Sequence, residues 1–511
     1  MENMRKATFT LFFIMAFAVS GCGAPVAPTQ PPADTATSAS PTLTPSPLPI
    51  AIEVPATSTL TPEPGLRTSG PYFAYFRYGP DHSDYQFVLM DADGGGKKVV
   101  DLPDEIVDSL SKANYQLGAR HVSPDGKWLA FYTGYAGEVY TGSTQSTAST
   151  FDLTLKLMNF ETGEIQIVSP LLSKDYPENF AKAMPEFDEY SHLRPEDLQN
   201  AFLFGITQAL AWSPDGRYLA FAGQMEGLSS DLYLYDMTTK KIQRKSNDIE
   251  ELQLISWSPD GKWILHGSKT ASVDPWVEYS IYAVALDDSS IRNLGSGLIG
   301  NWLNAHEILE YRSGIEKYQL SLVDLDTGNI TEIWEGYFGG YQVDPTGNWV
   351  VLDAISSTIP PKEEKPGFIY GSIQLINLNT LETIQNPSLL AEPLDAFLRA
   401  KDGTVFSLPH RIGILPSPDQ KYWVVVIGRD IKIYTQDLNS FMEVSSPFQD
   451  TNIYDVPWSP DDMQWSPDSS NLFLIYSTNV YHINISNGEI NLVETNLPST
   501  YWLDSGWING Q

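Results

Sequence analysis

Short apolar runs separated by polar turns recur along most of this chain. One unit, at residues 122–131, reads VSPDGKWLAF, and similar units lie around Ser213 and Ser258. The apolar stretch that follows each turn shows little polar alternation, which is typical of a strand buried on both faces. The pattern therefore predicts strand, turn and strand units that pack sheet against sheet.

The turn itself has a fixed composition. Serine suits its first position, proline presets φ at the second, aspartate is at home in the third, and glycine is favoured at the fourth, which together specify a type I turn. The Ser-Pro-Asp triplet recurs along the chain, with copies that begin at Ser123, Ser213, Ser258, Ser417 and Ser466.

A second half-repeat follows the first. It reads YQFVLMDADG at 85–94, LKLMNFETG at 155–163, LYLYDMT at 232–238 and LVDLDTG at 322–328. Each is a third strand followed by an Asp/Gly turn into a fourth strand. Four short strands joined by tight turns and repeated many times are the signature of a β-propeller. We therefore predict an all-β fold, a β-propeller of four-stranded antiparallel blades.

The spacing of the repeats predicts eight blades, with seven as the alternative if the first or the eighth is only a partial sheet. The first blade lacks an inner strand of its own, and the chain ends in YWLDSGW at 501–507. We expect this tail to supply the missing strand and close the ring, because closure removes exposed sheet edges. The blades are predicted to begin near Tyr72, Ala119, Thr207, Leu254, Gly297, Tyr341, Ile412 and Asp455.

These repeats, over about residues 70–511, resemble those of TolB-type and WD40-like propellers with the PD40 repeat. They are also similar to the propeller domains of prolyl oligopeptidase and dipeptidyl peptidase relatives. The TolB resemblance implies a propeller that docks envelope proteins. The peptidase activity is not implied, because the chain has no Gly-x-Ser-x-Gly pentapeptide and no length left for a hydrolase domain.

The N-terminus predicts a lipid anchor. Arg5 and Lys6 precede an apolar run at 9–18 that is typical of a secretory signal, and VSGC at 19–22 resembles a bacterial lipobox. The resemblance implies cleavage before Cys22 and lipidation of Cys22, the one cysteine of the chain. A signal peptide with a chance cysteine, or a transmembrane anchor, is the alternative.

These observations predict three segments. Residues 1–21 form a lipoprotein signal peptide, residues 22–68 carry the lipidated cysteine and a Pro/Thr/Ser-rich disordered linker, and residues 69–511 form the propeller. The predicted location is the bacterial cell envelope, lipid-anchored and extracytoplasmic. With 63 acidic against 31 basic residues, the net charge of -32 argues against nucleic acid and against anionic membrane surfaces.

The predicted partner is therefore a cell-envelope protein or a glycan, with the membrane contacted through Cys22. In an antiparallel blade the long connections lie opposite the short turns, and the longest is a helical insert at about 171–205. The alternative is that the aromatic residues of these loops only pack them onto the ring. The candidate binding residues are Tyr135, Tyr140, Phe180, Phe187, Tyr190, Trp276 and Tyr279.

Catalytic and metal-binding motifs are weak, so we predict no catalytic residues, no metal and no cofactor. The spacing of the seven histidines fits no zinc motif, and Asp324 and Asp326 lack the closing glutamate of a calcium loop. We expect a non-catalytic binding module. The alternative is a propeller-fold glycosidase or lyase, which three or more carboxylates at the mouth of the central channel would favour.

Overall fold

The computed structural model divides the chain into two units, Met1–Thr61 and Pro62–Gln511, and the structure describes residues of the second. Cys22 and the predicted signal peptide lie outside the described residues. The structure describes residues 65–508 except 68, 79–84, 114–116, 135–152, 176–205, 227–228, 248–250, 270–278, 314–317, 344–347, 356–370, 386–396, 400–404, 408–411, 420, 428–429, 436–440, 445–462, 477–478, 496 and 498–505.

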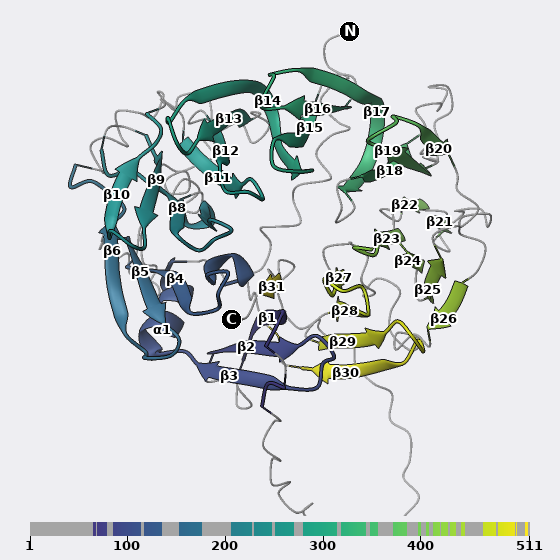
Figure 1. Cartoon of the computed structure of the whole chain (residues 1–511), viewed down its shortest axis with the longest axis horizontal. Coiled ribbons are helices and arrows are strands. Elements are labelled where there is room, and N and C mark those ends of the chain that lie inside the picture. Colours follow the sequence, from purple (N-terminus) through teal and green to yellow (C-terminus); the bar gives the residue numbers. More distant parts are fainter. Residues whose placement is uncertain are drawn as a thin grey trace, which may run out of the picture. The chain divides into compact units, whose positions relative to one another are not determined.

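The first sheet joins the two ends of the domain. Its strand order is β3-β2-β1-β31, all antiparallel, with β1 at Tyr72–Tyr78, β2 at Tyr85–Asp91, β3 at Lys97–Asp101 and β31 at Gly506–Ile508. In β31, Trp507 pairs with Phe73 and Ile508 pairs with Tyr72. The prediction that the C-terminal strand supplies the inner strand of the first blade is confirmed (Figure 1).

The next two sheets follow the same antiparallel order along the chain. Between the first sheet and the second lie α1 and a short 3-10 helix, and Val122 forms a bridge to Leu129 where an inner strand begins. The elements are α1 at Asp104–Ala113, η2 at Ala119–His121, β4 at Trp128–Thr133, β5 at Thr154–Asn159, β6 at Ile165–Pro170, β7 at Leu210–Trp212, β8 at Tyr218–Gly223, β9 at Asp231–Asp236 and β10 at Lys241–Arg244.

A continuous ten-stranded sheet, β11 to β20, spans the middle of the domain. Its strands β14 and β17 are long and carry register shifts at Leu298/Asn301 and Phe338/Tyr341, so each one ends one blade and begins the next. The strands are β11 at Glu251–Trp257, β12 at Trp263–Lys269, β13 at Tyr279–Ala285, β14 at Ile291–Trp302, β15 at Glu307–Ser313, β16 at Tyr318–Asp324, β17 at Ile330–Val343, β18 at Trp349–Ile355, β19 at Gly371–Asn377 and β20 at Thr383–Gln385.

A hairpin and two four-stranded sheets complete the domain. The strands are β21 at Phe397–Arg399 and β22 at Val405–Ser407 in the hairpin, then β23 at Ile412–Pro416, β24 at Tyr422–Ile427, β25 at Asp430–Thr435, β26 at Phe441–Val444, β27 at Met463–Trp465, β28 at Asn471–Tyr476, β29 at Asn479–Asn484 and β30 at Ile490–Glu494. The number of blades, eight or seven, stays a prediction, because the hairpin lies between segments outside the described residues.

The core lies between neighbouring sheets, which follow one another around a common centre (Figure 1). One apolar cluster runs from Phe87 in the first sheet through Leu157 and Leu219 to Ile264. Another joins the last sheet to the first, where Phe473 stacks on Phe73 with ring centroids 4.6 Å apart. Antiparallel four-stranded sheets that pack face to face in sequence order define the fold. The domain is a β-propeller.

Tryptophans of the inner strands connect neighbouring sheets. Trp212 and Trp257 are buried in the shared cluster, and Trp465 is buried in the cluster between the last two sheets. The Nε1–H group of Trp257 donates to the carbonyl of Ala211 at 3.0 Å, and that of Trp465 donates to Leu415 at 3.1 Å. Each indole therefore ties one inner strand to the preceding one.

Candidate functional site

The two ends of each sheet carry different connections. Turns between the first and second strands and between the third and fourth strands lie at one end, which we call the turn face; the other connections lie at the opposite end, the long-loop face. On the turn face, a Cβ placed on Gly216 would lie 3.6 Å from Pro124, and one placed on Gly261 would lie 3.6 Å from Pro214. Turns of consecutive sheets therefore touch one another.

The Ser-Pro-Asp turns that the structure describes are closed by the same side-chain hydrogen bonds. In the first, Gly126 N–H donates to the Ser123 carbonyl at 2.8 Å, which is the bond of the predicted type I turn. The Ser123 hydroxyl donates to Asp125 Oδ1 at 2.6 Å and accepts from the Trp128 N–H at 2.9 Å. The same pairs recur from Ser213, Ser258, Ser417 and Ser466. The repeated aspartates thus hold their own turns.

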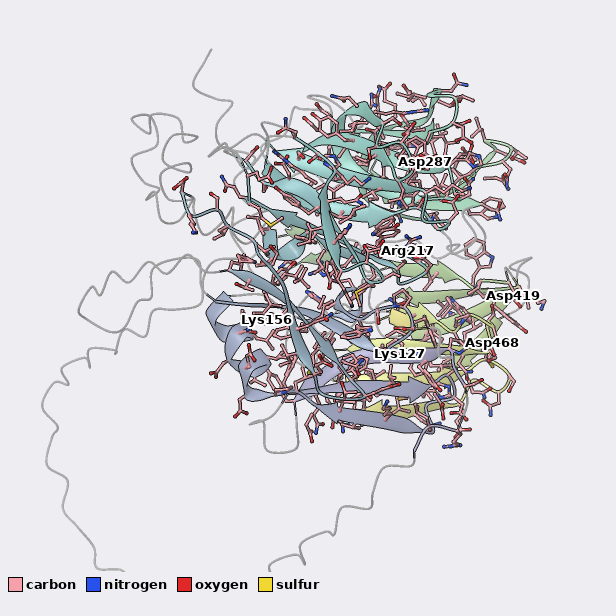
Figure 2. The ribbon with its side chains drawn as sticks, turned by 60° about the vertical axis from the view of Figure 1, so that its left-hand side comes forward. Lys127, Lys156, Arg217, Asp287, Asp419 and Asp468 are labelled. Atoms are coloured by element: carbon pink, nitrogen blue, oxygen red, sulfur yellow. The ribbon has the colours of Figure 1, made fainter. Side chains whose placement is uncertain are left out.

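Basic side chains follow several of these aspartates and neutralise them. Lys262 Nζ lies 2.8 Å from Asp260 Oδ2, and Lys421 Nζ lies 2.9 Å from Asp419 Oδ2. Burial alone would raise the pKa of Asp419, but the hydrogen bonds from Lys421 and Ser417 and the charge of Lys421 outweigh it and lower the pKa to about 2. Lys127, Arg217, Asp287, Asp419 and Asp468 lie along one side of the domain (Figure 2).

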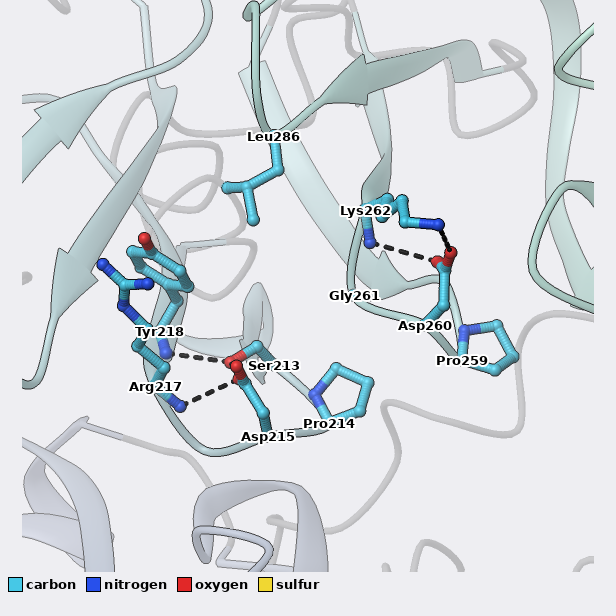
Figure 3. A pocket seen from close by; sticks show the side chains of 10 residues that line it. All are labelled: Ser213, Pro214, Asp215, Arg217, Tyr218, Pro259, Asp260, Gly261, Lys262 and Leu286. Carbon is cyan, nitrogen blue, oxygen red and sulfur yellow. Dashed lines mark hydrogen bonds and ion pairs between the residues drawn. The ribbon is translucent and has the colours of Figure 1, made fainter.

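A pocket of about 480 Å³ lies between two of these turns on the turn face. Its walls come from the β7–β8 turn and the β11–β12 turn, and Leu286 lies between them (Figure 3). Arg217 and Tyr218 extend toward Leu286, whereas Lys262 turns to its own Asp260. The lining residues are Ser213, Pro214, Asp215, Arg217, Tyr218, Pro259, Asp260, Gly261, Lys262 and Leu286. Sequence reasoning missed this pocket, because it needs two repeats side by side.

Most residues predicted to form the binding face lie outside the described residues. These are Tyr135, Tyr140, Phe180, Phe187, Tyr190 and Trp276. Tyr279 is the first residue of β13, and its backbone pairs with Gly297 of β14. The predicted face therefore stays a prediction. The structure does place Tyr279 at the long-loop end of its sheet, as the strand order requires.

The ends of the long insert are described even though its middle is not. Leu172 forms a parallel bridge to Gln224, and Ser173 N–H donates to the Gln224 carbonyl at 2.7 Å. At the other end, Ala209 accepts a backbone hydrogen bond from Ala222 at 3.0 Å. Both ends of the insert are therefore fixed to the β7–β10 sheet. The predicted helices of the insert lie outside the described residues.

At the long-loop end of the sheets, the structure groups charged and aromatic side chains that the sequence analysis did not predict. Arg244 binds Asp231, a fully buried carboxylate, and lies 3.4 Å from Glu226. Tyr78, which is 39% exposed, packs edge-on against Tyr85 with centroids 5.3 Å apart. No short motif marks these residues, since their grouping depends on strand register.

In the described part of the chain, no group of three or more His, Cys, Asp or Glu side chains is placed to hold a metal ion. The Asp324 turn is an ordinary blade turn, with Asp324 Oδ1 accepting from the N–H groups of Asp326 and Thr327. Burial lowers the pKa of His121 to about 3 and that of His266 to about 4, so both are neutral core residues at neutral pH.

The inner strands also carry few carboxylates. Glu251, at the start of β11, is the one acidic residue among their described residues. The inner strands are β7, β11, β23, β27, β31 and the inner halves of β14 and β17. A glycosidase needs at least two carboxyl groups facing one substrate.

Among all the residues that the structure describes, no helix has the length and hydropathy needed to cross a membrane.

No family model and no curated protein matches this chain. Among solved structures it is similar to TolB from Acinetobacter baumannii, at 17% identity and a TM-score of 0.29, covering 62% of this chain and 63% of that one. It is similar to dipeptidyl peptidase 4 of Porphyromonas gingivalis at 12% identity and a TM-score of 0.46, covering 84% of this chain and 60% of that one.

A third similar structure is an oligogalacturonate lyase from Vibrio parahaemolyticus, at 12% identity and a TM-score of 0.37, covering 79% of this chain and 93% of that one. The chain thus spans less than two thirds of the TolB and dipeptidyl peptidase chains. The predicted β-propeller fold is confirmed by the strand order of the sheets themselves, and a fold of this kind can carry many different functions.

Proposed function

We propose that this protein is a membrane-anchored extracytoplasmic lipoprotein whose propeller is a non-catalytic module that binds an envelope protein or a glycan. The observation that carries the proposal is the use of the repeated carboxylates. Asp125, Asp215, Asp260, Asp419 and Asp468 each accept hydrogen bonds from the serine and backbone of their own turn. Carboxylates occupied in this way hold the scaffold and are poorly suited to proton transfer.

The fold supports the same proposal. Contacts between the turns of neighbouring sheets, and hydrogen bonds from the tryptophan indoles, make the propeller a rigid frame. Rigid frames commonly present binding residues on their loops. The long insert leaves and rejoins the frame through Ser173 and Ala209, whose backbones are hydrogen bonded to the β7–β10 sheet. The proposed binding surface is the long-loop face, with the seven predicted aromatic residues on it.

The anchor is tested by fractionating cells that express the protein or its Cys22→Ser variant. We expect the native protein in the membrane fraction and the variant either released or unprocessed, because acyl chains on Cys22 would supply the membrane affinity. Thr37→Ser, in the same linker, is the matched control and should fractionate like the native protein. A Cys22→Ser variant that stays with the membrane in its processed form would contradict the anchor.

The binding role is tested by cross-linking in envelope extract with the native protein and a version in which residues 176–205 are replaced by a Gly-Ser loop. This design retains the anchoring pairs of Ser173 and Ala209. We expect a partner that only the native protein recovers, with equal melting temperatures for both. Equal recovery by both proteins would reject the insert as the binding element, and cleavage of a polysaccharide by the purified protein would favour the lyase or glycosidase alternative.

A further inference from the structure

The pocket on the turn face is a second candidate binding site, at the end of the domain opposite the proposed binding surface. Its volume of about 480 Å³ falls within the range of small-ligand sites. Both walls are held by closed turns, in which Ser213 and Ser258 bind Asp215 and Asp260 at 2.6 and 2.8 Å. The pocket is therefore formed before any ligand arrives, which lowers the entropy cost of binding.

Arg217 is the chemically distinctive group of this pocket. Its side chain is 52% exposed, and within the described part of the chain it makes one ion pair, from one terminal nitrogen to Asp236 Oδ2 at 3.2 Å. A guanidinium carries five N–H donors in a planar fork that matches a carboxylate. The Arg217 carbon Cζ lies 4.8 Å from the Tyr218 ring centroid, so the aromatic ring holds the fork in place.

The aspartates of the pocket are occupied within their own turns. Asp215 Oδ1 and Asp260 Oδ1 accept hydrogen bonds inside their own turns. Lys262, which is 78% exposed, pairs with Asp260, and exposed pairs of this kind exchange partners at little cost. Lys262 turns away from the Arg217 wall to Asp260, so Arg217 is the cation that faces Tyr218 and Leu286 (Figure 3).

The remaining lining favours a peptide over a sugar. Sugar rings are commonly held by a free aromatic face, but Arg217 covers Tyr218 at 4.8 Å and Trp257 stacks with it at 6.4 Å between centroids. Pro214, Pro259 and Leu286 provide apolar contacts for aliphatic carbon. We propose that the pocket binds an acidic side chain, Asp or Glu, of a peptide segment of a partner protein, with the carboxylate held by the guanidinium of Arg217.

The proposal is tested by ligand-observed NMR titration of the full-length protein with acetyl-Ala-Glu-Ala-amide. We expect a dissociation constant on the order of millimolar for one short peptide. The neutral acetyl-Ala-Gln-Ala-amide should not bind. Arg217→Gln should weaken binding by at least about tenfold, since it removes the charged fork. The control is Lys421→Gln, which also replaces a cation of a Ser-Pro-Asp turn by glutamine. It lies on a turn that does not line this pocket.

A second variant, Leu286→Trp, fills the pocket without altering a charge and should also abolish binding, which keeps the test decisive if Arg217→Gln melts early. Binding should persist when residues 176–205 are replaced, so this result is independent of the proposed binding surface. Equal affinity for the Glu and Gln peptides, unchanged affinity in Arg217→Gln and Leu286→Trp, or binding of D-galacturonate in place of the Glu peptide would each overturn the proposal.

Discussion

The junction between the β7–β10 and β11–β14 sheets differs in kind from the junction that closes the ring. The first joins neighbours in sequence and uses contacts that recur: the indole of Trp257 on the Ala211 carbonyl at 3.0 Å, and Gly261 against Pro214. Lys245 adds a hydrogen bond to the Ser289 hydroxyl at 2.7 Å. The second joins the last sheet to the first. There Glu494, 5% exposed, accepts hydrogen bonds from Tyr75 and Arg77 at 2.6 Å each and from Lys97 at 3.0 Å.

This difference indicates how the two kinds of junction are specified. An internal junction is repeated whenever the local motif is repeated, so its contacts are many and individually small. The closing junction occurs once, and its parts come from opposite ends of the domain. A buried carboxylate with two cations and a tyrosine is selective for that one pairing, since any partner without all three donors would leave a charge buried and unpaired.

Removing the closing strand is expected to have the largest effect. Deletion of residues 499–511 eliminates β31, including buried Ile508 and the Trp507 ring that packs on Phe73 and Phe473 at 5.6 and 5.7 Å. We expect a loss of about 5 kcal/mol or more of unfolding free energy, because two large apolar side chains and a strand pairing are lost together. Urea denaturation measures the loss, and size-exclusion chromatography should reveal association through the exposed edge of β1.

The matched control for this deletion is Ile167→Ser, on the exposed outer strand β6 of an internal sheet. Its denaturation midpoint should be close to that of the native protein. A deletion variant that keeps the native midpoint and elutes as the native protein does would show that β31 does not close the ring.

Replacing the central carboxylate should have the next largest effect. Glu494→Leu removes the buried carboxylate that Arg77 and Lys97, each 12% exposed at the side chain, both contact. We expect destabilisation by about 3–5 kcal/mol, since breaking a buried ion pair leaves an uncompensated charge. Lys421→Gln removes an exposed pair of an internal turn and should leave the midpoint nearly unchanged. Equal midpoints for the two variants in urea denaturation would remove the distinction between the junctions.

The same network predicts how stability changes with pH. Burial alone would raise the pKa of Glu494, but the hydrogen bond from Tyr75 and the charges of Lys97 and Arg77 outweigh it and lower the pKa. A carboxyl whose pKa is lower in the folded state contributes stability above its ordinary pKa of about 4.3 and loses it as the pH falls through the folded value. Native protein should therefore lose stability below about pH 5.

Glu494→Gln separates this network from the aspartates of the internal turns, several of which also have lowered pKa values. The native protein should exceed the variant in unfolding free energy at pH 7, and the gap should close as the pH falls toward 3, because protonated Glu494 then resembles glutamine. Urea denaturation at a series of pH values measures the gap. A gap that stays constant over this range would mean that the charge of Glu494 does not support the closure.

The sequence predicts the internal contacts well because they are local. The type I turn at Ser123 and the inter-sheet role of Trp257 follow from residue types within one repeat. The closing strand was also predictable, since one inner strand was missing from the count. The Glu494 network was not, because Tyr75 lies 419 residues away and a single acid in a charged chain carries no motif.

Other features escaped prediction for similar reasons. Asn304 takes the place of the turn aspartate, because its Oδ1 accepts hydrogen bonds from the N–H groups of His306 and Glu307. A search for the Ser-Pro-Asp motif does not find this turn. The helix α1 interrupts the repeat between the first and second sheets. The pocket at Arg217 depends on two turns meeting across a sheet junction, which no single repeat encodes.

The smallest predicted effect concerns one internal turn that departs from the repeat. At the last position of the Asp/Gly turn, Gly163, Gly328 and Gly488 adopt φ values of 70, 75 and 70°. Leu381 occupies the equivalent position with φ of 58° and is 45% exposed. A side chain in this left-handed conformation costs roughly 1–2 kcal/mol, and glycine relieves the cost but loses more chain entropy on folding.

Leu381→Gly should therefore stabilise the domain by about 0.5–1 kcal/mol, and Gly328→Leu, its mirror change, should destabilise it by a similar amount. A Cβ on Gly328 would meet no atom within 4 Å, so the mirror change isolates backbone strain from steric clash. Thermal and urea denaturation of both variants measure the two signs. Because an internal junction is the sum of many such local choices, restoring one of them should shift the midpoint slightly and leave the Glu494 closure untouched. If both variants were destabilised, contacts of the Leu381 side chain would outweigh its backbone strain, and the turn could not be treated as an interchangeable unit of the repeat.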